Sequence, residues 1–169
     1  MSQRKQPPRF FLDRSLGRKA VPEALRADGW DVITLAEHYG MPADEQVADT
    51  DWIEGAAERG WPIFMKDKRI RHRQAEITAV AEHKARCFVI TRGDLASADM
   101  AQRFITTKAA ILAATVEPGP YIYSVQRDRI SRLYPELPGH SIIQPSGHAA
   151  RRDAATRLLF RLGSQEDLT

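Results

Sequence analysis

Short apolar runs alternate with helical stretches along most of this chain, and this alternation limits the possible folds more than any other feature. Runs of strand type occupy residues 9–13, 31–36, 62–65, 87–91 and 121–125. Helical patterns lie between them at residues 19–28, 49–60, 74–84 and 98–115. Strands that alternate with helices form βαβ units with right-handed crossovers, and such units build a parallel sheet. The sequence therefore predicts an α/β fold around a central, mostly parallel sheet.

Length and composition favour one domain with a tail. The chain has 169 residues, 43% of them hydrophobic, which is enough for a core. We expect a disordered basic segment at residues 1–8, the α/β domain at 9–135, and a Pro/Gly-rich segment with a short basic helix at 136–169. No apolar run approaches the ~20 residues that span a bilayer, and the basic N-terminal residues precede no long apolar stretch. We therefore expect neither a membrane anchor nor a secretory signal.

The single cysteine limits the chemistry of the chain. Cys87 has no partner for an intrachain disulfide, and one thiol cannot form a cysteine zinc cluster. Because Cys87 lies in the apolar run CFVIT, we expect a buried, unreactive thiol. These features fit a protein of the reducing cytoplasm.

Basic residues are clustered although the net charge is only +3. The three clusters are Lys66, Lys68, Arg69, Arg71 and Arg73, then Arg127, Arg129 and Arg132, and finally Arg151, Arg152, Arg157 and Arg161. Clustered cations indicate a polyanionic partner such as nucleic acid, although a solvated surface is the simpler interpretation of the third cluster. The first cluster also contains Asp67, which gives it additional interest.

Three separate segments are predicted to bring carboxylates to one edge of the sheet. Asp13 ends the first strand, Asp67 follows the third, and Asp49 and Asp51 begin the helix that leads to the third strand. In parallel α/β sheets, ligands bind beyond the carboxyl ends of the strands. Mg²⁺ takes carboxylate oxygens, keeps several waters and binds phosphates, so it would relieve the repulsion among these groups. The neighbouring cations Lys66, Lys68, Arg69 and Arg71, with Arg14 beside Asp13, would then contact nucleic-acid phosphates.

Each acid also has a simpler explanation. Asp13 could end a strand at a turn, and Asp67 could pair with Lys66 or Arg69 at the surface. Asp49 and Asp51 occupy positions typical of helix N-caps, and for Asp51 alone the capping interpretation is the better one. The coincidence of all three segments at one edge favours a metal site.

The same segments resemble a known family. RFFLDRSLGRKAVPEALRADGWDV and DTDWIEGAAERGWPIFMKDKRIRHRQAE resemble the opening and the middle of the PIN-like domains of VapC-type toxins, from bacterial toxin–antitoxin pairs. The resemblance covers about residues 9–125. It implies a PIN-like three-layer fold with helices on both faces of the sheet, a Mg²⁺ or Mn²⁺ site, cleavage of single-stranded or structured RNA, and a cognate antitoxin. A homodimer is a further option that the sequence leaves open.

The resemblance also assigns roles to the acids. Asp13 and Asp67 match the acids that follow the first and third strands, and Asp49 fits the spacing of the middle acid better than Asp51. A fourth acid is expected near the fourth strand, where Asp94 is the candidate replacement. The two-metal form of the chemistry would depend on such a fourth acid.

The function predicted from the sequence is therefore a metal-dependent endoribonuclease with Asp13, Asp49 and Asp67 as catalytic acids. One alternative is a catalytically silent PIN-like module that binds RNA or a protein. A second is an aspartyl phosphotransferase or phosphatase, although Ser15 stands where that class usually carries a second acid.

Overall fold

The computed structural model describes residues 6–136, and the statements below concern this part of the chain. Within it, one sheet has six strands in the order β2-β1-β3-β4-β5-β6. Their bounds are Phe10–Leu12 (β1), Val32–Thr34 (β2), Ile63–Lys66 (β3), Arg86–Ile90 (β4), Tyr121–Val125 (β5) and Ile130–Tyr134 (β6). The first five strands run parallel to one another, and β6 pairs with β5 in the antiparallel sense. The predicted mostly parallel α/β sheet is confirmed.

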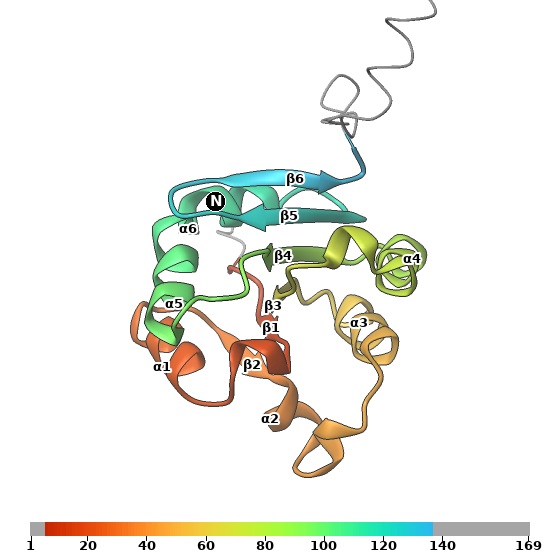
Figure 1. Ribbon diagram of the computed structural model, residues 1–169, viewed down its shortest axis with the longest axis horizontal. Helices are drawn as coiled ribbons and strands as arrows, with labels where there is room; N and C mark the ends of the chain where they lie inside the picture. Colours follow the sequence, from red (N-terminus) through yellow and green to blue (C-terminus); the bar gives the residue numbers. More distant parts are fainter. Residues whose placement is uncertain (1–5, 137–169) are drawn as a thin grey trace, which may run out of the picture. The chain divides into compact units, whose positions relative to one another are not determined.

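Helices cover both faces of the sheet, as the predicted three-layer fold requires (Figure 1). The helices are Ala20–Ala27 (α1), Leu35–Tyr39 (α2), Asp49–Glu58 (α3), Gln74–His83 (α4), Ser97–Thr106 (α5) and Lys108–Ala114 (α6). Short 3₁₀ turns lie at Arg14–Leu16 (η1), Ala43–Glu45 (η2) and Ile70–His72 (η3).

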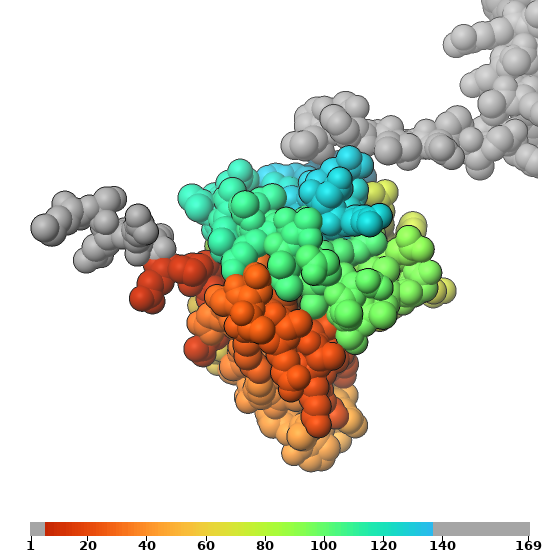
Figure 2. Space-filling view, turned by 90° about the vertical axis from the view of Figure 1, so that its left-hand side faces the viewer, coloured from red at the N-terminus to blue at the C-terminus, as the bar shows by residue number. Residues whose placement is uncertain are grey.

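Alternating strand residues supply two separate hydrophobic layers. Phe10 and Leu12 of β1 pack with α1, α5 and α6, whereas Phe11 between them packs against Trp52 of α3 on the opposite face. Successive side chains of a strand point to opposite faces, so both faces of this sheet are apolar and need a cover. Figure 2 looks at one covered side, where α1, in orange, and the green to teal α5 and α6 lie together over the sheet.

Two predicted elements differ from the structure. The pattern at residues 98–115 predicts one helix, but α5 ends at Thr106 and α6 begins at Lys108. At the junction, the Thr107 hydroxyl donates a hydrogen bond of 2.7 Å to the Arg103 carbonyl, a contact that bends helices. In the first half of the chain, the region after β2 contains the short helix α2 in place of a loop.

Strand β6 was not predicted. Its residues Ser131 and Arg132 break the apolar run, and as an edge strand it needs only one partner. The predicted basic segment 1–8 lies outside the described residues for positions 1–5. The predicted C-terminal segment and its basic helix lie outside them from position 137 onward.

The order of the strands places a topological switch point between β1 and β3. From β1 the chain passes to its neighbour β2 on one side, whereas from β3 it passes to its neighbour β4 on the other side. The connections that leave β1 and β3 therefore lead to opposite faces of the sheet, α1 on one and α4 on the other. Ligands bind at such switch points, beyond the carboxyl ends of the strands. Among the described residues, no helix has the length and apolar character that crossing a membrane requires.

Candidate functional site

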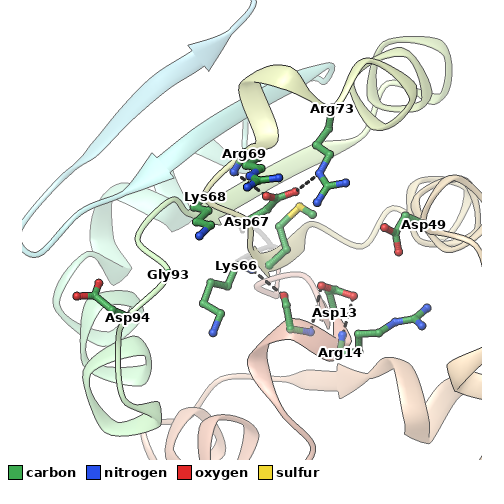
Figure 3. Close-up of a pocket in the computed structure, with 12 residues that line it drawn as sticks. Asp13, Arg14, Asp49, Lys66, Asp67, Lys68, Arg69, Arg73, Gly93 and Asp94 are labelled. Carbon is green, nitrogen blue, oxygen red and sulfur yellow. Dashed lines mark hydrogen bonds and ion pairs between the residues drawn. The ribbon is translucent and has the colours of Figure 1, made fainter.

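A pocket of about 830 Å³ lies at the carboxyl ends of β1 and β3, and we call it the carboxylate pocket (Figure 3). Four acids and five bases line it, together with three other residues. They are Asp13, Arg14, Ser15, Asp49, Met65, Lys66, Asp67, Lys68, Arg69, Arg73, Gly93 and Asp94. Asp13, Asp49 and Asp67 thus meet in one pocket although they come from three separate segments.

Asp13 is buried directly after β1, with 6% of its surface exposed. Its carboxylate caps η1 by accepting hydrogen bonds from the backbone N–H of Arg14 (2.6 Å) and Ser15 (3.2 Å). Burial raises the pKa of Asp13 and the charge of Asp49 raises it further, while hydrogen bonds from Ser15 and Arg14 oppose the rise. The ionised form of Asp13 is therefore unfavourable in this buried position, and a nearby cation would stabilise it.

Ser15 joins the turn after β1 to the third strand. Its Oγ accepts a hydrogen bond of 2.9 Å from the backbone N–H of Lys66, fifty-one positions away in the sequence. This contact fixes η1, and with it Asp13, against the end of β3, where Asp67 follows. The Ser15 hydroxyl thus holds two of the acid-bearing segments together.

Asp49 is the first residue of α3 and lines the carboxylate pocket. One of its oxygens, Oδ1, accepts a hydrogen bond of 3.0 Å from Nε1 of the fully buried Trp52. Asp51, in the same first turn, is exposed and does not line the pocket. The structure therefore brings Asp49, and not Asp51, beside Asp13.

The loop before α3 is held by two arginines from the first βα connection. Arg14 donates to the carbonyls of Glu45 (3.0 Å) and Val47 (2.5 Å), and Arg18 pairs with the buried Asp44 at 2.8 Å. Both contacts restrain the segment that ends at Asp49. Arg14 was predicted to contact phosphate, but in the structure its guanidinium is engaged by this loop.

Asp67 is held on both carboxylate oxygens. The backbone N–H of Arg69 donates to Oδ1 at 2.7 Å, and Nε of Arg73 donates to Oδ2 at 3.2 Å. Asp67 is largely buried, whereas half of the Arg73 side chain is exposed. Figure 3 shows Arg73 on the side of Asp67 that faces Asp49.

Three predicted phosphate contacts line the pocket with uncommitted side chains. Within residues 6–136, the side chains of Lys66, Lys68 and Arg69 make no hydrogen bond or ion pair. Figure 3 places Lys66 and Lys68 toward Gly93, on the side away from Asp49. Arg71 lines a different depression, with Ile77 and Leu133, so the structure does not bring it to the carboxylates.

Asp94, the candidate fourth acid, lies at the far side of the pocket from Asp49 (Figure 3). It forms a 2.8 Å ion pair with Arg92, which lowers the pKa of Asp94, and 73% of its side chain is exposed. The structure therefore places Asp94 at the exposed rim of the pocket, paired with Arg92.

The carboxylates of the pocket meet the needs of a divalent cation in part. Within residues 6–136, no three Asp, Glu, His or Cys side chains are close enough to hold one ion as they stand. However, Asp13 and Asp49 interact electrostatically in one pocket, and carboxylate oxygens are the donors that Mg²⁺ and Mn²⁺ prefer. The donor chemistry of Asp13 and Asp49 therefore suits such an ion, whereas Asp67 lines the same pocket with its carboxylate paired to Arg73.

Sequence reasoning missed the role of Arg73 at this site. It was recognised as part of the first basic cluster, but its pairing with Asp67 depends on the η3 turn between them. Spacing in the sequence gives no signal for this contact. The sequence likewise does not indicate that Gly93 and Met65 line the pocket.

Comparisons with known proteins agree with the predicted resemblance. The model of a family described as "PIN like domain" matches residues 8–92. A curated protein of Mycobacterium tuberculosis named "Putative ribonuclease VapC45" is 42% identical over 124 residues, which cover 73% of this chain and 90% of that protein. No solved structure matches the chain.

Proposed function

The chain belongs to the PIN-like domain family, and we propose that it is a Mg²⁺- or Mn²⁺-dependent endoribonuclease that acts on single-stranded or structured RNA. The observation that carries this proposal is that Asp13, Asp49 and Asp67 line one pocket at the switch point of the sheet. The name of the Mycobacterium tuberculosis relative, which describes a ribonuclease, also supports it.

In this proposal, Asp13, Asp49 and Asp67 hold the ion. When bound, such an ion activates a water molecule for attack on a phosphodiester and stabilises the leaving oxygen. Asp13 and Asp49 are preorganised, one by the η1 backbone and the other by the Trp52 indole. Asp67 completes the set by exchanging its contact with Arg73 for the ion.

The cations of the pocket would orient the substrate. Lys66, Lys68 and Arg69 have no competing partner within residues 6–136, so they are available for the oxygens of the phosphate chain. A lysine or arginine beside a metal site holds the phosphodiester in place and balances its charge. Asp94 could join as a fourth acid only by leaving Arg92.

Cleavage of total cellular RNA, with Mg²⁺, Mn²⁺ or EDTA, tests the proposal. We expect metal-dependent cutting by the wild type and none by Asp13→Asn or Asp67→Asn. Asp51→Asn is the matched control, because it removes a carboxylate from the same region that lies outside the pocket. A wild type that cuts no RNA under any metal would contradict the nuclease function.

One observation favours a second candidate, a catalytically silent module that binds RNA or a protein. The pairing of Asp67 with Arg73 neutralises an acid that catalysis needs. Binding of RNA without metal-dependent cutting would support this reading. The phosphotransferase alternative gains no such support, because Ser15 binds the Lys66 backbone in place of a second acid.

We also propose that the protein acts in the cytoplasm as the toxin of a toxin–antitoxin pair. The basis is its similarity to a VapC protein. Expression of the chain alone should arrest growth, and co-expression of the protein encoded beside it should restore growth and co-purify with it. Unimpaired growth during expression of active wild-type enzyme would contradict the toxin role.

A further inference from the structure

A second pocket of about 740 Å³ lies on the same edge of the sheet, and we call it the arginine pocket. It is formed by the residues after β4, by α5 and by the turn that joins β5 to β6. Its lining residues are Arg92, Leu95, Asp99, Gln102, Arg103, Thr106, Arg127 and Asp128. Because β4 and β5 run parallel to β1 and β3, their carboxyl ends lie at the edge that holds the carboxylate pocket.

The two pockets share one loop, residues 91–96 between β4 and α5. Gly93 and Asp94 line the carboxylate pocket, whereas Arg92 and Leu95 line the arginine pocket. The ion pair between Arg92 and Asp94 connects the lining of one pocket to that of the other. The exposed fractions of the two side chains are 61% and 73%. Such exposed pairs are weak, so Arg92 can exchange Asp94 for a phosphate at little cost.

The arrangement of cations indicates which way the RNA strand runs across the carboxylate pocket. On the Asp49 side of the carboxylate pocket, Arg14 and Arg73 are engaged by the protein itself. On the Gly93 side, the uncommitted Lys66 and Lys68 lead toward the shared loop (Figure 3). An RNA strand that contacts Lys66 and Lys68 and continues past Gly93 reaches the arginine pocket.

The arginine pocket offers cations at its end of this path. Within residues 6–136, Arg103 and Arg127 form no salt bridge, and the only hydrogen bond of the Arg103 side chain is a 3.4 Å contact with the Val125 carbonyl. Three arginines and two aspartates line the pocket, so its formal charge is +1. We therefore expect each arginine to make a modest contribution to binding.

We propose that the arginine pocket binds the phosphodiester backbone of the RNA strand that flanks the cleaved bond. This inference rests on the proposed nuclease function and extends it to a second contact region. The carboxylate pocket holds the bond to be cut, and Arg92, Arg103 and Arg127 hold phosphates of the flanking nucleotides. Short substrates end before the arginine pocket, so they gain nothing from it.

Arg127 and Arg129 provide a matched pair for the test. Both are exposed and both lie near the turn between β5 and β6, but only Arg127 lines the arginine pocket. Arg129 instead donates to the side chain of Gln126 at 3.0 Å. Arg127→Gln and Arg129→Gln therefore make the same change in charge a few residues apart.

The measurement is fluorescence anisotropy of labelled single-stranded RNA of about 4 and about 12 nucleotides. EDTA is present so that the strand is not cut. We expect Arg127→Gln to weaken binding of the longer strand roughly threefold, and to flatten the dependence of log Kd on log salt concentration by about 0.7. Arg129→Gln should match the wild type, and neither variant should change binding of the short strand. With Mg²⁺, Arg127→Gln should raise KM for long RNA and leave kcat unchanged.

Equal binding of the long RNA by both variants, together with cleavage by the wild type, would contradict the RNA contact at the arginine pocket. The proposed nuclease function would not be affected. A loss of affinity that is the same for both strand lengths would contradict this contact as well, since a flanking contact must depend on length. If the wild type neither binds nor cuts RNA, both proposals fall together. Arg103→Gln, on a different element, should repeat the length-dependent loss if the inference is correct.

Discussion

Nε of Arg73 lies 3.2 Å from Oδ2 of Asp67, so an arginine occupies the carboxylate that a metal ion would need. The other oxygen of Asp67 accepts the Arg69 backbone N–H at 2.7 Å. Asp67 therefore has no oxygen without a hydrogen bond, whereas Asp13 and Asp49 already interact with each other electrostatically. In this arrangement the ion and Arg73 compete for the same group.

Replacing Arg73 should strengthen metal binding. An ion pair with a half-exposed arginine contributes roughly 0.2–1 kcal/mol, so Arg73→Gln should raise Mn²⁺ affinity by up to about fivefold. Isothermal titration calorimetry with Mn²⁺ measures this directly. Arg71→Gln, the same change two positions away and outside the pocket, is the control. Weaker binding by Arg73→Gln would show instead that Arg73 orients Asp67 for the ion.

Asp49 and Asp51 should differ sharply in their effect on cleavage. Asp49 lines the pocket and influences Asp13, whereas Asp51 is exposed and lies outside the pocket. We expect Asp49→Asn to lower kcat/KM for RNA by at least about 10²-fold, because even outer residues of metal sites cost 10–100-fold. Asp51→Asn should stay within about twofold of the wild type. Equal losses in the two variants would mean that the first turn of α3 rearranges when the ion binds.

Arg14 should act through the position of Asp49. Its two hydrogen bonds to the carbonyls of Glu45 and Val47 restrain the loop before α3. Arg14→Gln should lower the free energy of unfolding by ~1 kcal/mol and weaken Mn²⁺ binding by about tenfold. Chemical denaturation and calorimetry give the two values. The control Arg9→Gln removes an exposed ion pair with Asp31 and should change neither. If Arg14→Gln weakens RNA binding alone, its role is the direct phosphate contact predicted from the sequence.

Asp13 should destabilise the metal-free protein at neutral pH. Burial raises its pKa in the folded state above the ordinary value of about 3.9, so between these two pKa values the folded state binds more protons than the unfolded one. Stability is therefore lost as pH rises through that window, and the deficit persists at pH 7. In EDTA, Asp13→Asn should be more stable than the wild type at pH 7, and the two should converge below the ordinary aspartate pKa.

Denaturation curves from pH 3 to 8, with EDTA or with Mn²⁺, test this prediction. Saturating Mn²⁺ should reverse the order at pH 7, because it stabilises only the protein that binds it. A less stable Asp13→Asn variant at pH 7 in EDTA would show that the hydrogen bonds from Arg14 and Ser15 outweigh the cost of burial.

Much of the fold was predictable because hydrophobic periodicity is a local signal. Phe10, Phe11 and Leu12 form a continuous apolar run, as a strand covered on both faces must. Helix α2 was missed although Thr34 and Glu37 have the spacing of a capping box, and the structure contains both of its hydrogen bonds. The spacing of Thr34 and Glu37 therefore indicates the start of this helix from the sequence alone.

The candidate site was predictable only to the level of the segments that form it. The ends of parallel strands share an edge, so Asp13 and Asp67 could be placed there from topology alone. The choice between Asp49 and Asp51 depends on the rotation of the first turn of α3, which the Trp52 hydrogen bond stabilises. The pairing of Arg73 with Asp67, and of Arg14 with the loop before α3, requires tertiary contacts that spacing does not encode.

The hydrogen bond from Trp52 to Asp49 gives the protein an optical reporter of its own ligand state. The indole is fully buried and its N–H points at a proposed metal-binding carboxylate. Any change in the charge or position of Asp49 alters the electric field at that indole, and hence its near-ultraviolet dichroism and emission. In a chain whose other two tryptophans, Trp30 and Trp61, are replaced by phenylalanine, events at the carboxylate pocket could be followed in real time without an added label.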